Sequence, residues 1–386
     1  MTTILNNIPQ GYKATALGVI PQEWKAMRLG DVCTLINGRA YKQNELLSQG
    51  KYKILRVGNF FTNESWYFSD MELDSSKYAF KGDLLYAWSA SFGPRFWTGD
   101  QVIYHYHIWK ICNYRGVDQQ YLYYFLDYDA SLLQRDTQGG TMHHITKQSM
   151  EKRFIPVPPL GEQRKIAEVL GVWDLAIAKQ VQLVERLTER KRALMQRLLT
   201  AKLRLPGFST PWKKVKLGDV AELYQPQTIQ SEDLLQTGYP VYGANGFIGY
   251  YSSYNHEHSQ VVITCRGSSC GAVNFTPEKC WITGNAMVLN VDNNRDVNKS
   301  FFYYLISNSS FINLISGSGQ PQIVRRPLLK FELHIPPLDE QTAIAEVLTA
   351  ADREIELAQA KLELYRRQKR GLMQQLLTGK KRIPYL

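Results

Sequence analysis

The feature that most constrains the fold of this 386-residue chain is an internal duplication. The block WKAMRLGDV at residues 24–32 returns as WKKVKLGDV at residues 212–220, which is 188 residues later. The block PPLGEQ at residues 158–163 returns as PPLDEQ at residues 336–341, which is 178 residues later. Self-similarity over such a distance indicates that the chain contains two copies of one structural unit.

The two copies differ between their shared blocks. Residues 33–154 and 221–332 show little similarity to each other, and both carry short runs of β-branched and aromatic residues, such as QVVIT at 260–264. Short runs of this kind, separated by turn residues, are typical of β-strands. The sequence therefore predicts two divergent, largely β domains, with short helices near residues 119–126 and 300–306.

The segment that closes each copy has the pattern of a long helix. Each begins after a Pro-Pro pair, which prevents an earlier helical start, and carries an acidic residue in the first turn, where it suits the helix dipole. Apolar residues then repeat at alternating spacings of four and three for about 40 residues, which favours a coiled coil over a single stripe on a bundle helix. The predicted seam contains Ile166, Leu170, Trp173, Ile177, Val184, Leu187, Leu194 and Leu198 in the first helix, and Ile344, Leu348, Ile355, Leu362, Tyr365, Leu372 and Leu376 in the second.

The predicted fold class is α+β with an internal pseudo-two-fold repeat. Two β-rich domains, at residues 1–160 and 205–338, are separated and joined by a central helix at 161–204 and a distal helix at 339–386. Each helix ends near the start of the other repeat, so antiparallel pairing closes the circuit without a long crossover. Lys191 and Lys369 hold equivalent seam positions, where they either select the orientation or extend their ammonium groups to solvent.

The net charge of +11, from 46 basic and 35 acidic residues, permits a nucleic-acid partner. Residues 186–204 carry seven basic residues and one acidic residue, and residues 366–382 carry seven basic residues and no acidic one. These charges either contact phosphates or complement the C-terminal ends of the helices, and both interpretations stay open. The chain has no apolar run of about 18 residues and no signal-peptide pattern, so we expect a cytoplasmic protein.

Signatures of catalysis are missing from the sequence. There is no GxxxxGK[ST] phosphate loop, and neither Pro-Pro pair belongs to the NPP[YF] loop of an amino-methyltransferase. The spacing of Cys265, Cys270 and Cys280 is unusual for structural zinc. His105 and His107 have no paired carboxylate or nucleophile beside them, so we interpret them as exposed or partner-bound histidines. We therefore expect no catalytic residue and no metal site.

Four motifs give the chain its closest likeness to a known family. They are GVIPQEW at 18–24 with LGDV at 29–32, IPVPPLGEQ at 155–163 with its echo HIPPLDEQ at 334–341, KRALMQRLLT at 191–200 with its echo KRGLMQQLLTGK at 369–380, and GQPQI at 319–323. In this order the motifs resemble the specificity subunit of type I restriction–modification enzymes. The first repeat departs from the last motif and has GTMHHI at 140–145 in its place.

The resemblance implies two target-recognition domains, each reading one half of an asymmetric, bipartite site in double-stranded DNA. It also implies helices that dock two DNA-methyltransferase subunits, with two restriction subunits possible in addition. The chain itself would be non-catalytic, and would support adenine methylation and DNA cleavage only within the complex. S-adenosylmethionine, ATP and Mg are then expected in the partner subunits. The alternative is a coiled-coil scaffold that carries two β-rich protein-binding modules.

Candidate DNA contacts are basic groups that bind phosphates and planar polar or aromatic groups that read base edges. In the first domain they are Arg39, Tyr41, Lys42, Arg56, Asn59, Trp88, Arg95, His143, His144 and Lys147. In the second domain they are Tyr242, Asn245, Arg266, Ser268, Ser269, Asn285, Gln320, Gln322, Arg325 and Arg326. The strongest candidate segment is 320–326, because it combines two amides with two adjacent guanidinium groups.

Overall fold

The computed structural model describes residues 8–61, 64–89, 92–136, 145–243, 246–317 and 319–384. The chain forms two compact units. Unit 1 comprises Met1–Lys179 and Lys361–Leu386, and unit 2 comprises Gln180–Ala360. Both long helices contribute to both units, so the predicted domain boundaries at the helix ends stay a prediction.

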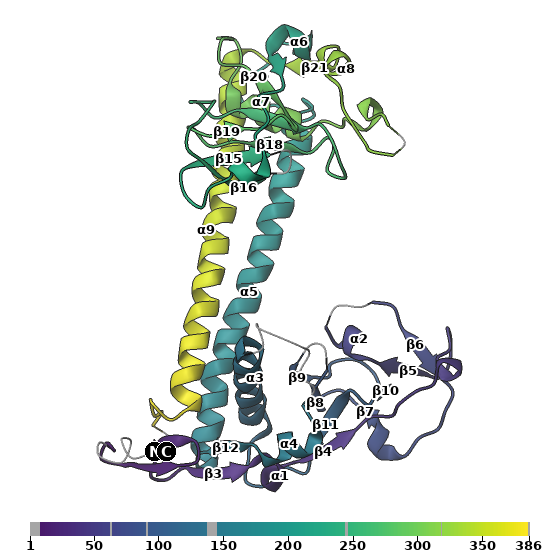
Figure 1. The fold of residues 1–386 in the computed structure, drawn as a ribbon, viewed down its shortest axis with the longest axis vertical. Helices are drawn as coiled ribbons and strands as arrows, with labels where there is room; N and C mark the ends of the chain where they lie inside the picture. Colours follow the sequence, from purple (N-terminus) through teal and green to yellow (C-terminus); the bar gives the residue numbers. More distant parts are fainter. Residues whose placement is uncertain are drawn as a thin grey trace. The chain divides into compact units, whose positions relative to one another are not determined.

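Within its described residues, unit 1 forms two four-stranded sheets and two two-stranded sheets. Their arrangement is shown in Figure 1. Its strands are β1 (Tyr12–Thr15), β2 (Gly18–Pro21), β3 (Lys25–Arg28), β4 (Thr34–Asn37), β5 (Tyr52–Leu55), β6 (Tyr67–Ser69), β7 (Tyr78–Ala79), β8 (Leu84–Ala87), β9 (Gly93–Phe96), β10 (Val102–Tyr104), β11 (Ile108–Cys112) and β12 (Phe154–Val157). Its short helices are α1 (Leu29–Val32), α2 (Val57–Phe61), α3 (Gln119–Asp136) and α4 (Lys147–Lys152). The strand orders are β6-β5-β10-β7 and β4-β11-β8-β9, with the pairs β1-β2 and β12-β3 beside them.

Unit 2 repeats this plan with fewer elements. Its strands are β13 (Lys213–Lys216), β14 (Glu222–Tyr224), β15 (Tyr239–Gly243), β16 (Gly246–Tyr251), β17 (Val261–Thr264), β18 (Val273–Phe275), β19 (Trp281–Ile282), β20 (Ala286–Asn290) and β21 (Glu332–Ile335). Its short helices are α6 (Leu217–Val220), α7 (Lys299–Ser307) and α8 (Arg325–Leu329). The order β14-β20-β17-β18 matches β4-β11-β8-β9, and β16-β15-β19 matches β6-β5-β10. The divergent segments therefore share one topology.

The two constant helices are α5 (Leu160–Leu198) and α9 (Leu338–Leu377), and they pair in antiparallel fashion (Figure 1). In unit 1 the rings of Trp173 and Tyr365 meet edge to face, with centroids 5.7 Å apart. In unit 2 the Gln180 side chain donates a hydrogen bond to the Ala358 carbonyl at 2.9 Å. Every predicted seam residue is buried or half-buried. The predicted fold class, with two β-rich domains and an antiparallel helix pair, is confirmed.

The two seam lysines have equivalent partners. Lys369 Nζ lies 2.5 Å from a carboxylate oxygen of Asp174 and over the Tyr124 ring. Lys191 Nζ likewise lies 2.5 Å from a carboxylate oxygen of Asp352 and over the ring of Tyr304, the unit 2 counterpart of Tyr124. Each lysine therefore has a specific partner on the opposite helix. An ion pair between fixed positions on the two helices favours one register of the coiled coil.

A buried carboxylate at the start of each helix forms a second matched contact. Glu162 is fully buried, accepts a hydrogen bond from the Trp24 indole at 2.9 Å, and is paired with Arg382 at 2.6 Å. The equivalent carboxylate in unit 2, Glu340, is also fully buried and is bonded by Arg204 at 2.5 Å. Each buried glutamate thus binds an arginine of the segment that follows the other long helix.

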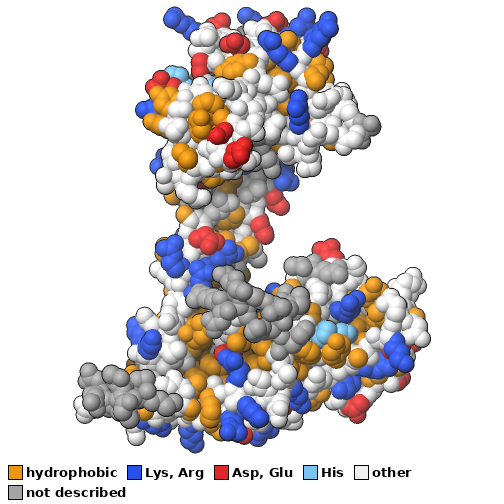
Figure 2. All heavy atoms as spheres, in the orientation of Figure 1, with side chains coloured by type: hydrophobic (Ala, Val, Ile, Leu, Met, Phe, Trp, Pro, Cys, Tyr) orange, Lys and Arg blue, Asp and Glu red, His pale blue; other side chains and the backbone are white. Residues whose placement is uncertain are grey.

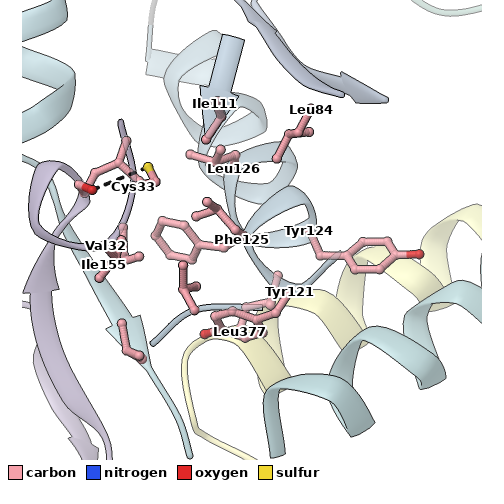
Figure 3. Packing of buried hydrophobic residues seen from close by; sticks show 14 of the residues in the cluster. Val32, Cys33, Leu84, Ile111, Tyr121, Tyr124, Phe125, Leu126, Ile155 and Leu377 are labelled. Carbon is pink, nitrogen blue, oxygen red and sulfur yellow. Dashed lines mark hydrogen bonds between the residues drawn. The ribbon is translucent and has the colours of Figure 1, made fainter. Parts of the chain in front are cut away.

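The core of unit 1 joins elements that are far apart in the sequence. Side chains of α1, α3, β12 and α9 meet there, including Val32, Phe125, Ile155 and Leu377 (Figure 3). The helix α3 is ten residues longer than the predicted 119–126 segment because its C-terminal half also packs: Ala130 is 3% exposed and would lie 3.8 Å from a Cβ at Gly93. The predicted helix at 300–306 is confirmed as α7.

Candidate nucleic-acid interface

Three loops of unit 2 meet beside β17 and bring three of the candidate residues together. Arg266 and Gln322 form an isolated antiparallel bridge. The amide of Cys265, next to Arg266, donates to the carbonyl of Asn285 at 3.1 Å. The side chains of Arg266, Asn285 and Gln322 are exposed. A guanidinium and two amides on one surface are the groups that read guanine and adenine in the major groove.

The backbone around Gln322 is held on both sides. Ser316 and Gln322 exchange two amide-to-carbonyl hydrogen bonds, of 2.9 and 2.8 Å, and the Gly267 amide donates to the Pro321 carbonyl at 3.1 Å. Because these bonds use only main-chain groups, they fix the loop without engaging the Gln322 amide side chain. Gln320 is exposed in the same loop.

The predicted loop at 320–326 ends earlier than expected. Arg325 and Arg326 form the first turn of α8, where Pro327 is tolerated because its missing N–H would have no partner within the helix. Arg325 lines a hollow with Asn290 and Arg295. The two guanidinium groups of the candidate segment therefore belong to a helix and not to the loop that contains Gln320 and Gln322.

The other candidates of unit 2 lie near this surface or outside the described residues. Ser268 and Ser269 belong to the loop that follows β17, and Ser268 is exposed. Tyr242 is the last residue but one of β15, and its carbonyl accepts a hydrogen bond from the Thr283 amide at 3.0 Å. Asn245 lies outside the described residues.

Unit 1 presents a hollow of about 440 Å³ at the end of β5. Its lining includes Arg56, Asn59, Trp66, Tyr67, His105 and His107. The Arg56 guanidinium lies over the Tyr67 ring, 5.2 Å from its centroid. In Figure 2, histidine side chains lie on this domain with hydrophobic and basic side chains around them. Aromatic faces and cationic groups that share a hollow are suited to bases and phosphates.

His107 also borders a neighbouring hollow of about 520 Å³, which contains Trp88 and Lys147. The Trp88 indole donates to the Tyr106 carbonyl at 2.9 Å, so its ring is fixed in place. Lys147 is the first residue of α4 and is exposed, with Glu151 at 3.6 Å one turn along. Because His107 borders both hollows, they join into one surface. This surface carries three sequence-predicted residues, Arg56, Trp88 and Lys147, together with His105 and His107.

Several candidates of unit 1 have their polar groups engaged within the domain. Arg39 donates two hydrogen bonds to Glu45, which hold the pKa of that carboxyl below its usual range. The Asn59 amide donates to the Ser65 carbonyl at 2.6 Å. Arg95 lies over the Phe61 ring, 4.8 Å from its centroid. Lys42 is exposed and Tyr41 half-buried, while His143 and His144 lie outside the described residues.

The two histidines of the first hollow were not among the predicted contacts. Burial, with smaller contributions from His107 and Arg56, lowers the pKa of His105 to about 4. The His105 imidazole is therefore neutral at physiological pH, and it has one donor and one acceptor nitrogen. One sequence signal could have indicated this pair: the two histidines lie in the short turn between two strand-like segments, QVIY at 101–104 and the run that begins at Ile108.

Across the described residues, no group of three or more His, Cys, Asp or Glu side chains is placed to hold a metal ion. In the same part of the chain, no helix combines the length and apolar character needed to cross a membrane.

Comparison with known proteins identifies the family. The model of the type I restriction modification DNA specificity domain matches residues 21–188 and again 209–364. The chain belongs to this family. A putative type I restriction enzyme specificity subunit of Methanocaldococcus jannaschii, MjaX, is 26% identical over 97% of both chains. The MjaVIII specificity subunit of the same organism is 25% identical over 79% of this chain and 80% of its own.

A solved structure shares the fold. The S subunit of a type I restriction–modification system from M. genitalium superposes with a TM-score of 0.61, at 17% identity, over 98% of this chain and 99% of its own. The family model describes a DNA specificity domain, and this chain contains two matches to it. The chain is thus a specificity subunit with a role in DNA sequence specificity, which favours DNA recognition over the protein-scaffold alternative.

Proposed function

We propose that each β-rich domain reads one half of an asymmetric, bipartite site in double-stranded DNA. The observation that carries this proposal is that the same strand orders recur in both units, while the exposed loops carry different side chains. Unit 2 presents Arg266, Asn285 and Gln322, whereas unit 1 presents Arg56 and aromatic groups. One architecture with two different polar surfaces supports two different half-sites.

We further propose that α5 and α9 dock two DNA-methyltransferase subunits, with restriction subunits added in a cleaving complex. Val172 and Leu175 lie one turn apart on α5 and are 63% and 57% exposed, and Leu357 on α9 is 64% exposed. Apolar side chains on helices whose seams are already filled support a protein partner. Adenine methylation and DNA cleavage would then belong to these partners, together with S-adenosylmethionine, ATP and Mg.

Substitution of the unit 2 loop residues tests the DNA-reading proposal. Gln322→Ala should relax base preference at one position of one half-site, by about 1–3 kcal/mol, because a bidentate amide contact is lost. The measurement is a map of methylated sites in host DNA for wild type and variant. Lys279→Ala is the control, since Lys279 is exposed in another loop. A palindromic or uninterrupted wild-type motif would contradict the two-reader proposal.

The basic C-terminal segment gives a second, separable expectation. Lys380 and Lys381 are exposed, whereas Arg382 is paired with Glu162 and Glu23. If the two lysines contact phosphates, the double Lys→Ala variant should reduce the slope of log affinity against log salt by about two units. The measurement is DNA affinity across a salt series. An unchanged slope means that these charges serve the helix end or solvation.

A further inference from the structure

The turn that joins β10 to β11 in unit 1 has a counterpart between β19 and β20 in unit 2. Each turn has three residues, 105–107 and 283–285. The first follows β10, which pairs in parallel with β5, and the second follows β19, which pairs in parallel with β15. The two sequences, HYH and TGN, share no residue. Sequence comparison therefore does not reveal that the turns are equivalent.

Three pairs of backbone hydrogen bonds establish the equivalence. His105 N donates to the Leu55 carbonyl at 2.9 Å, as Thr283 N does to the Tyr242 carbonyl at 3.0 Å. Within the turns, Ile108 N donates to the His105 carbonyl at 2.9 Å, and Ala286 N to the Thr283 carbonyl at 3.0 Å. These bonds place the first residues of the two turns at equivalent positions.

The third residues of the two turns are equivalent by the same criterion. Trp88 N donates to the His107 carbonyl at 3.1 Å, and Cys265 N donates to the Asn285 carbonyl at 3.1 Å. Trp88 and Cys265 each follow the matched strands β8 and β17. His107 thus occupies in unit 1 the position that Asn285 occupies beside Arg266 and Gln322 in unit 2.

The middle residue shows how the two turns differ. A Cβ at Gly284 would lie 2.5 Å from Thr228 Oγ1 and 2.7 Å from the Pro226 carbonyl oxygen, so a larger residue does not fit there. Unit 1 has Tyr106 at this point, with its ring centroid 3.9 Å from that of His107. The Tyr106 ring is exposed and packs against the His107 imidazole.

We propose that His107 reads a base of the half-site bound by unit 1, with His105 as its positioning residue. The inference rests on the proposed DNA-reading function and assigns a residue to it. His107 borders both hollows of this domain, of which one is also lined by Arg56 and the other by Lys147. The backbone N–H of His107 donates a hydrogen bond to His105 Nδ1 at 3.5 Å, so the His105 ring holds the backbone of the third residue of the turn. A planar imidazole on a surface that also carries Arg56 and Lys147 is suited to contact a base edge, while the cationic groups bind phosphates.

The test uses the full-length chain in its native complex and a library of random DNA duplexes. In His107→Ala, we expect discrimination at one position of one half-site to fall about tenfold or more, while the other half-site keeps its preference. In His107→Asn, which introduces the residue of the unit 2 turn, we expect a changed base preference at that same position, because Asn pairs with adenine. His258→Ala is the matched control, since His258 is an exposed histidine of unit 2 outside the reading loops.

The outcomes separate this inference from the function on which it rests. If the wild-type complex enriches no sequence, the DNA-reading proposal itself fails. If the wild type enriches a bipartite motif but His107→Ala and His107→Asn both keep its full discrimination, only the assignment of His107 fails. An equal loss at both half-sites in both variants also overturns the assignment, because a base-reading residue acts on one half-site.

Discussion

Arg382→Ala should lower the free energy of unfolding of unit 1 by about 3 kcal/mol, because it leaves the buried Glu162 carboxylate without its cationic partner. Glu162 is fully buried, and its remaining side-chain partner is the Trp24 indole at 2.9 Å. Breaking a buried ion pair from one side costs about 3–5 kcal/mol, and we take the lower end because the Arg382 side chain is 31% exposed. The loss of stability is measured by urea unfolding, in which hydrogen exchange of the α5 amides in unit 1 reports the unfolding of that unit.

The opposite substitution should cost less. Glu162→Gln removes the buried charge and leaves the half-exposed Arg382 free to bind water and Glu23, so we expect a loss of about 1 kcal/mol. Lys380→Ala is the control for the same segment and should stay within about 0.5 kcal/mol of wild type. Equal losses for Arg382→Ala and Lys380→Ala would show that the Glu162 contact contributes little to stability.

This contact also limits what a charge count can reveal. In the sequence, Arg382 is one of seven basic residues at 366–382. In the structure it is paired with two carboxylates, and Lys369 is paired with Asp174. Both carboxylate partners on α5 lie about 200 residues earlier in the chain, so no local pattern identifies them. The charge count at 366–382 therefore overstated the number of basic side chains that are available to bind phosphates.

The helices were predictable because their signal is periodic and long. The seam from Ile166 to Leu198 repeats over many turns, and the same spacing recurs in the second helix, so chance agreement is small. Orientation followed from the duplication, since each helix must end near the start of the other repeat. These features depend on residues close in the sequence or on the internal repeat, and both can be recognised in a single sequence.

The candidate recognition surfaces were less predictable because they depend on how loops meet. Arg266, Asn285 and Gln322 were each proposed for their chemistry, but their proximity depends on backbone hydrogen bonds between separate segments. His107 was not among the predicted contacts, because the sequence does not show that its turn is equivalent to the turn that contains Asn285. Side-chain type alone does not identify such positions, whereas the strand order does.

The shared framework predicts that a recognition domain can be exchanged as a unit. The Gln163 side chain accepts from the Asp118 amide at 2.7 Å and donates to the Gly116 carbonyl at 3.0 Å. Gln341 makes the same two contacts in unit 2, with the Asn298 amide and the Asp296 carbonyl. Both glutamines hold the variable segment by its backbone, so the junction does not depend on which side chains that segment carries.

Replacing residues 33–154 with the equivalent segment of a family member should therefore change one half-site completely and leave the other unchanged. Methylated motifs in host DNA, mapped before and after the exchange, give the result. The matched experiment replaces residues 221–332 and should change the complementary half-site. A change in both half-sites after either exchange would mean that the two domains do not read independently. A folded exchange that keeps the original motif would place recognition outside the variable segments, in the shared helices.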